Sequence, residues 1–278
     1  MALKTVDLKP RIGTEVIADA ETLLSGKHAA QLRDLLEKRA ILLFRGINFS
    51  PDQHLAFSRT LGQVVADNGT KNNRDGVVTV SMDKKVMPEA ELFKASFFWH
   101  FDGSIDPIPP RASLLTARVL AQDGGGETEF ANTTAAYDDL PDDEKKAYDK
   151  VRVIHSLEAN QRVVDPLPSY ATLMEWRRVA PHPRSHPLVW HHKSGRNSLV
   201  VGATASHVDG WALEDGRGLL CRLLDWATQP QYVYRHTWAV GDLIVYDNTG
   251  VLHRAMPYDA ASGRTMQRTT LVGEEDLV

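Results

Sequence analysis

A histidine and an aspartate stand two residues apart at His100 and Asp102, and another histidine, His253, lies far downstream. Residues at this spacing on a β-strand point to the same face, so one strand could bring both side chains to one point. Two histidines and one carboxylate are the facial ligand set for non-haem Fe(II), which leaves coordination positions open for reactants. Because the same set also suits Zn²⁺, a zinc hydrolase remains a second interpretation of these residues.

The short His-x-Asp motif is weak by itself. With 11 histidines and 36 acidic residues in the chain, about one or two such pairs are expected by chance. A second pair indeed occurs at His207 and Asp209. Context favours the first pair, because His100 lies in the aromatic-rich run 97–101, whose side chains we expect to pack and to exclude water from one side of a metal site.

Two arginines, Arg264 and Arg268, follow His253 in the chain. Their spacing of four residues places them on the same face of a strand. Arginines that face the inside of a barrel require anions, and a dicarboxylate co-substrate could supply one and an acidic substrate the other. The alternative is that either arginine forms a structural ion pair.

Short strands dominate the elements that must position these residues. Apolar runs and turn residues predict strands at 41–44, 77–82, 112–120, 127–130, 186–191, 198–202, 232–238, 242–246 and 265–272. The turn at 193–196 predicts a hairpin between the fifth and sixth of these strands. Helices are expected at 21–39, from Ser50-Pro51 to Gly62, over 142–152 and over 212–227. The pattern predicts a mainly β fold with flanking helices and a jelly-roll core.

Length and composition are those of one globular unit. The 278 residues suit a single domain spanning 1–278, with a proline- and arginine-rich insertion or lid at 158–185. A net charge of -4 without a basic stripe argues against nucleic acid as a partner. The single cysteine, Cys221, excludes a disulfide within the chain and a cysteine-rich zinc site, and it favours a reducing compartment. We see no secretory signal and no apolar stretch of membrane-spanning length, so we expect a cytoplasmic protein without membrane contact.

Taken together, these segments make the chain resemble the TauD/TfdA family of 2-oxoglutarate-dependent dioxygenases. The resemblance covers nearly the whole chain and includes residues 43–46, 53–58, 99–102, 125–130 and 135–138. Within the family, the chain is similar to the 2,4-dichlorophenoxyacetate dioxygenase branch through residues 194–196, 205–210, 214–217, 227–229, 232–236 and 241–243. Residues 64–96 and 158–185 match relatives poorly.

The resemblance implies a double-stranded β-helix of the cupin type that uses Fe(II), 2-oxoglutarate and dioxygen. His100, Asp102 and His253 correspond to the iron ligands of the family. Arg264 and Thr128 correspond to the residues that hold the distal carboxylate of 2-oxoglutarate. The expected reaction is hydroxylation of a substrate, with succinate and CO₂ as co-products.

The resemblance also implies a small anionic organic substrate, such as an aryloxyalkanoate or an aromatic acid. Arg268 corresponds to the position that faces the anionic end of the substrate. His207 is demoted as a metal ligand but kept as a residue near the substrate pocket, and Ser96 and Lys71 are further candidate substrate contacts. Relatives assemble, so a homo-oligomer is expected.

Two other interpretations stay open. The same chemistry could act on a sulfonate or a sulfate ester, since Arg268 recognises only an anion. A non-catalytic, metal-binding, cupin-like sensor is the alternative of another class. The intact ligand set together with Arg264 argues against a sensor and against a zinc hydrolase, because neither requires the 2-oxoglutarate arginine.

Overall fold

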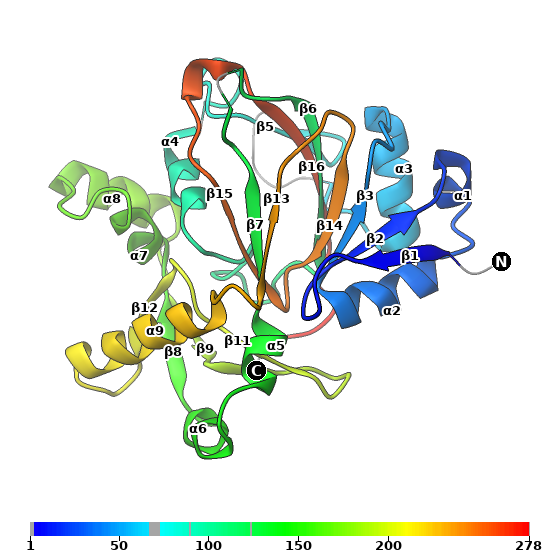
Figure 1. Cartoon of the computed structure of the whole chain (residues 1–278). Coiled ribbons are helices and arrows are strands. Elements are labelled where there is room, and N and C mark those ends of the chain that lie inside the picture. Colours follow the sequence, from blue (N-terminus) through cyan, green and yellow to red (C-terminus); the bar gives the residue numbers. More distant parts are fainter. Residues whose placement is uncertain (1–2, 67–72, 89, 123, 278) are drawn as a thin grey trace.

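Two facing β-sheets form the centre of the molecule (Figure 1). The computed structural model describes residues 3–66, 73–88, 90–122 and 124–277. The larger sheet has the strand order β1-β2-β3-β14-β6-β16-β5-β4, and the smaller has the order β13-β7-β15. The strands of the larger sheet are β1 (Lys4–Asp7), β2 (Thr14–Ile17), β3 (Ile41–Phe44), β14 (Leu243–Asp247), β6 (Ala112–Val119), β16 (Thr265–Leu271), β5 (Val77–Val80) and β4 (Asn73–Arg74). Those of the smaller are β13 (Val233–His236), β7 (Thr128–Asn132) and β15 (Val251–Ala255).

Alternation along the strands explains why two sheets pack face to face. Ile41 and Leu43 of β3 belong to the apolar cluster between the sheets, together with Phe130 of β7. The intervening Leu42 and Phe44 point the other way, into a cluster beneath the N-terminal helices. Both faces of this strand are therefore covered, as its continuous apolar run predicts. The predicted jelly-roll core of the cupin type is confirmed.

Three helices cover the outer face of the larger sheet: α1 (Ala20–Leu24), α2 (Ala29–Arg39) and α3 (Pro51–Leu61). The prediction of one helix over 21–39 is wrong, because the chain turns at Gly26 with φ +68° and restarts after His28. The predicted start of α3 is confirmed. Ser50 accepts a hydrogen bond from the backbone of Gln53, whose side chain bonds back to Ser50.

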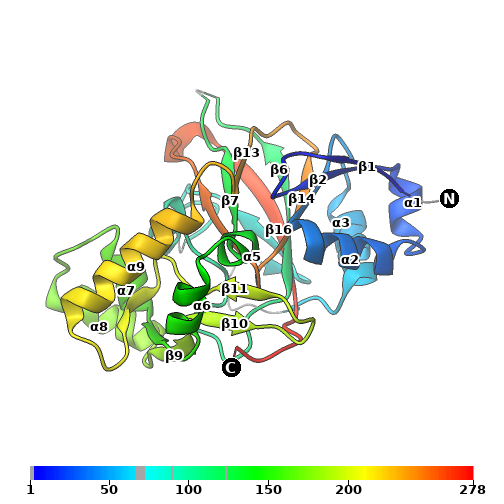
Figure 2. The same cartoon turned by 60° about the horizontal axis from the view of Figure 1, so that its bottom comes forward.

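A second, smaller region packs beside the two sheets (Figure 2). It contains the sheet β12-β8-β9 and the hairpin β10-β11, with helices α5, α6 and α9 against them. The bounds are β8 (Arg152–His155), β9 (Arg184–Pro187), β10 (Val189–His191), β11 (Asn197–Leu199), β12 (Ala205–Val208), α5 (Thr133–Asp138), α6 (Asp142–Tyr148) and α9 (Leu213–Ala227).

Two of the sequence predictions need correction in this region. The helix expected over 142–152 ends at Tyr148, because Arg152 already pairs with Pro187 in a sheet. The strand expected over 186–191 is divided, since β9 pairs with β8 whereas β10 forms the predicted hairpin with β11.

The segment 158–185, for which no regular structure was expected, contributes two helices. These are α7 (Leu157–Arg162) and α8 (Tyr170–Val179). Each begins at a serine whose hydroxyl accepts a backbone N–H of the first turn, Ser156 for α7 and Ser169 for α8. A short helix α4 (Ala90–Phe93) and the 3₁₀ turn η1 (Lys94–Phe97) border the same cavity as α7. Among the described helices, none combines the length and the apolar character needed to cross a bilayer.

Candidate active site and metal centre

The side chains of His100, Asp102 and His253 converge, with candidate ligand atoms all within 4.8 Å of one another. His253 lies on β15, and its backbone exchanges two hydrogen bonds with His100, of 3.1 and 2.8 Å. The expectation that one strand carries both His100 and Asp102 is wrong. His100 forms only an isolated β-bridge, with His253, and Asp102 lies in the turn that follows.

The histidines are arranged as neutral ligands. The Nδ1 atom of His100 lies 2.8 Å from the carbonyl of Phe98, which can only accept, so Nδ1 carries the proton and Nε2 is free. Burial lowers the pKa of His253 to about 3, with a further contribution from His100. Nε2 of His253 lies 3.9 Å from Oδ1 of Asp102, too far for a hydrogen bond. Two neutral imidazoles and one carboxylate around such a gap fit a divalent metal ion.

The second oxygen of Asp102 is occupied by protein donors. Oδ2 accepts from Arg268 at 3.1 Å, from Ser113 at 3.3 Å and from Tyr246 at 3.3 Å. Burial raises the pKa of Asp102, but the charge of Arg268 and the hydrogen bond from Ser113 act against burial, and the pKa lies below its ordinary value. Asp102 is therefore a carboxylate whose Oδ1 remains free to face a metal ion.

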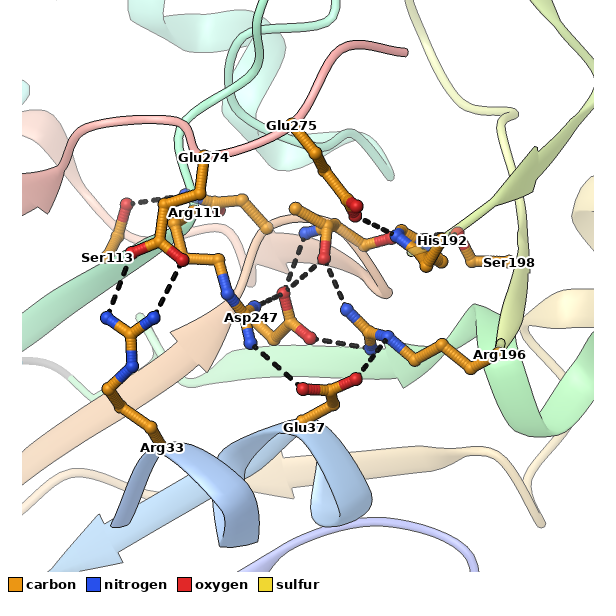
Figure 3. A network of polar contacts seen from close by, with 12 residues as sticks. Arg33, Glu37, Arg111, Ser113, His192, Arg196, Ser198, Asp247, Glu274 and Glu275 are labelled. Atoms are coloured by element: carbon orange, nitrogen blue, oxygen red, sulfur yellow. Dashed lines mark hydrogen bonds and ion pairs between the residues drawn. The ribbon is translucent and has the colours of Figure 1, made fainter. Parts of the chain in front are cut away.

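A polar network around the buried Asp247 includes Ser113, which bonds Asp102 (Figure 3). The side chain of Asn248 donates to Ser113 at 3.0 Å, so it holds the serine that bonds Asp102. The adjacent Asp247 is fully buried and pairs with Arg111 at 2.6 Å and with Arg196 at 2.7 Å. This network joins the end of β14 to β6 and to the β10-β11 hairpin, and it holds the turn that carries Asn248.

The converging residues open into a cavity of about 410 Å³. Its wall contains Arg264 and Arg268, so the two predicted arginines do face one space. Arg264 is 5% exposed, donates to the carbonyl of Gly126 at 2.7 Å and lies 4.6 Å from the ring centroid of Tyr258. Thr128 also lines the cavity, and its hydroxyl accepts from Trp238 at 3.0 Å. The remaining hydrogen of that hydroxyl and the guanidinium of Arg264 could bind a carboxylate.

The other predicted substrate contacts do not all lie in one cavity. Ser96 lines the same cavity as the converging ligands. His207 does not line it, but borders a second cavity on the far side of α7. Lys71 lies outside the described residues. The roles assigned to these side chains stay predictions.

The sequence reasoning missed two residues of the site, Ser113 and Tyr246. Both hydroxyls bond Asp102 although both residues lie on strands more than ten positions away. A buried serine within the apolar run 112–120 was the available signal for Ser113. For Tyr246, the signal was its place at the end of the predicted strand 242–246, directly before the polar pair Asp247-Asn248.

Comparisons with known proteins agree with this geometry. The sequence profile of the taurine catabolism dioxygenase TauD, TfdA family matches residues 4–270. Alpha-ketoglutarate-dependent 2,4-dichlorophenoxyacetate dioxygenase of Burkholderia sp. (strain RASC) is 39% identical, over 88% of this chain and 86% of the relative. The protein of the same name from Cupriavidus pinatubonensis is 36% identical, with 92% of each chain covered. A crystal structure of AAD-2 with Mn(II) and N-oxalylglycine superposes with a TM-score of 0.83 at 30% identity, covering both chains completely.

Proposed function

We propose that this chain, which belongs to the TauD/TfdA family of dioxygenases, hydroxylates a small aryloxyalkanoate or a related aromatic acid. The chain is an Fe(II)- and 2-oxoglutarate-dependent dioxygenase that acts on a small anionic organic substrate. The single observation that carries the substrate proposal is the position of Arg268. Its guanidinium lies in the wall of the cavity and 3.1 Å from Asp102, so an anion bound there would be next to the metal site.

In this proposal His100, Asp102 and His253 hold the metal. Bound Fe(II) supplies oxidation of a substrate carbon by dioxygen, coupled to conversion of 2-oxoglutarate to succinate and CO₂. Arg264 and Thr128 bind the distal carboxylate of 2-oxoglutarate, and this holds the co-substrate in one pose. The bonds from Arg268, Ser113 and Tyr246 to Oδ2 leave Oδ1 of Asp102 to the metal.

The walls of the cavity support a substrate with an apolar, flat body. They include Leu92, Phe93, Phe101, Ile105, Leu157 and Met266. Arg268 recognises the charge by charge-assisted hydrogen bonds, while these side chains would cover an aryl ring. A volume of about 410 Å³ lies within the range of small-molecule sites. The names of the relatives in the 2,4-dichlorophenoxyacetate branch support the same class.

The test is succinate formation with Fe(II), ascorbate and 2-oxoglutarate. Phenoxyacetate and 2,4-dichlorophenoxyacetate are compared with benzoate, taurine and an alkyl sulfate. We expect stimulation by an aryloxyalkanoate that is lost in Arg268→Gln. The matched control is Arg118→Gln, an arginine of β6 that bonds Gln267 and does not line the cavity. If only taurine or the alkyl sulfate stimulates succinate formation, the substrate is instead a sulfonate or a sulfate ester.

We further propose that residues 1–278 act as one domain, as a homo-oligomer in the cytoplasm and without nucleic acid or membrane partners. The net charge of -4 supports the absence of nucleic acid binding. Helix α7, which contributes Leu157, Asn160 and Gln161 to the cavity wall, supports a lid role for the α7-α8 segment. Light scattering of the purified protein measures the assembly, and a single cooperative unfolding transition would support one domain.

A further inference from the structure

A second cavity, of about 790 Å³, lies beside the active-site cavity. It is bordered by β8, β12 and the helices α7, α8 and α9, which gather on one side of the molecule (Figure 1). Among the described residues, none lines both cavities. His207, which the sequence assigned to the substrate pocket, belongs to this second space.

Helix α7 is the partition between the two cavities. Leu157 and Gln161 face the active-site cavity, whereas Glu158 and Arg162 face the second one. This division follows from helical geometry, since residues four apart share a face. Any displacement of α7 therefore changes both walls together.

Covalent neighbours of two proposed metal ligands form another part of the second wall. Trp99 precedes His100, and Arg254 follows His253. The guanidinium of Arg254 lies 4.5 Å from the ring centroid of Trp99, and it is also paired with Glu129 at 2.7 Å. The second cavity thus borders the back of the metal centre.

The lining of this cavity is apolar at its floor and cationic at its rim. Trp176 and Leu220 are each 6% exposed and belong to the wall. Glu158 is the one carboxylate among the described lining residues, and Arg162 already bonds it at 2.9 Å. Arg177 and Arg217 also line the cavity, and neither pairs with a carboxylate of the described residues. Two uncompensated guanidinium groups above an aromatic and aliphatic floor match a ligand with an anionic end and an apolar body.

We propose that this cavity is a second binding site, for an organic anion with an apolar body, and that its occupancy changes the affinity of the active site. The inference goes beyond the proposed reaction, because the ligand here is bound and not oxidised. The coupling is expected because α7 contributes residues to the walls of both cavities. In addition, Trp99 and Arg254 of the second cavity are covalently bonded to His100 and His253 of the metal site. By linkage, a ligand that alters co-substrate affinity has its own affinity altered by the same factor.

The probe for this site is 8-anilinonaphthalene-1-sulfonate, an apolar anion whose fluorescence rises on binding. It is titrated into the full chain with Mn(II) and saturating N-oxalylglycine already present, so that the metal and co-substrate positions are filled, and a parallel titration adds phenoxyacetate to fill the substrate space. We expect saturable binding of one probe per chain, with energy transfer from tryptophan that falls in Trp176→Phe, since Trp176 lines the cavity. The neutral analogue N-phenyl-1-naphthylamine is expected to bind roughly tenfold more weakly, because it lacks the charge-assisted bonds.

The double variant Arg177→Gln/Arg217→Gln tests the residues directly. Both side chains are exposed, so folding is expected to be unaffected. Affinity for the sulfonate probe should fall roughly tenfold, with little change for the neutral probe. Arg178→Gln is the matched control, since Arg178 is exposed on the same helix but bonds Glu175 and does not line the cavity. Coupling is read as a shift in the Kd of N-oxalylglycine when the sulfonate probe is saturating.

Three results would overturn the proposal. Suppose that excess phenoxyacetate displaces the probe at the same concentrations at which phenoxyacetate fills the active site. That result would assign the probe to the active-site cavity. Equal affinity of the charged and neutral probes would remove the role of the arginines. Loss of probe binding as the protein self-associates, measured by sedimentation, would mean that a second copy of the chain covers this face.

Discussion

Arg268 donates through Nη1 to Oδ2 of Asp102 at 3.1 Å, and each of the two side chains is 18% exposed. One guanidinium therefore reaches both a proposed metal ligand and the open cavity. Its several N–H groups in a fixed fork can serve two acceptors at once, which an ammonium group at the same place would do poorly. We predict that Arg268→Lys raises KM for an anionic substrate about tenfold while the Kd for Mn(II) changes far less. Unchanged KM in this variant would count against a role of Arg268 in substrate binding.

Tyr246 is predicted to position Asp102 through its hydroxyl. Tyr246→Phe removes a donor at 3.3 Å from Oδ2 of Asp102. It keeps the aromatic ring, whose centroid lies 5.4 Å from the ring centroid of Phe130. We expect a loss of about 1 kcal/mol in Mn(II) binding, or roughly fivefold in Kd, with unchanged thermal stability. Tyr234→Phe is the control, because that hydroxyl contacts His236 outside the cavity. Equal effects of the two variants would contradict a specific role for Tyr246.

Gly126 is predicted to be required for the position of Arg264. Its φ is +73°, and an added Cβ would lie 2.5 Å from Nε of Arg264. Gly126→Ala should displace the guanidinium and weaken 2-oxoglutarate binding about tenfold, as expected when charge-assisted bonds are lost. Gly124→Ala is a matched control, since φ is +84° there and no atom lies within 4 Å of the added Cβ. Both variants carry roughly 1–2 kcal/mol of backbone strain, so only their difference in co-substrate Kd reports on Arg264.

Asp247 is predicted to contribute most to stability among the residues of Figure 3. It is fully buried between Arg111 and Arg196, so Asp247→Asn leaves two largely buried cations with only the longer, partly exposed pairs to Glu37, at 3.7 and 3.6 Å. The expected loss is about 3–5 kcal/mol of unfolding free energy, measured by urea denaturation. The comparison is Glu175→Gln, which breaks an exposed pair with Arg178 and should leave the urea midpoint unchanged.

Stability should decrease in mild acid because of His54. Burial lowers the pKa of this histidine to about 3, with a further contribution from Arg118. Between pH 6.5 and 3 the unfolded chain therefore binds a proton that the folded chain does not, so unfolding becomes easier as pH falls. The slope from this residue approaches about 1.4 kcal/mol per pH unit, and His54→Gln should remove it. His28→Gln, at a partly exposed position, is the control, and an identical pH dependence in wild type and His54→Gln would refute this assignment.

The sequence by itself determined the features that depend on local periodicity and local capping. The continuous apolar run at 41–44, the strand pattern at 265–271 and the Ser50 cap of α3 are local properties, and the structure agrees with them. The candidate ligands His100, Asp102 and His253 could also be chosen from the sequence, because few combinations of residue types suit the chemistry. The break at Gly26 was missed, since an isolated glycine costs a helix only about 1 kcal/mol and packing decides whether the helix continues.

Tertiary structure alone decided which distant side chains meet. Tyr246 and Ser113 reach Asp102 because β14 and β6 are adjacent in one sheet, a pairing between residues more than 100 positions apart in the chain. In the same way, only the packing of α7 against the sheets separates His207 from the active-site cavity. The local sequence pattern limits the conformation of each segment. Which segments become neighbours is decided by the burial of apolar side chains from distant parts of the chain, and the site forms where those segments meet.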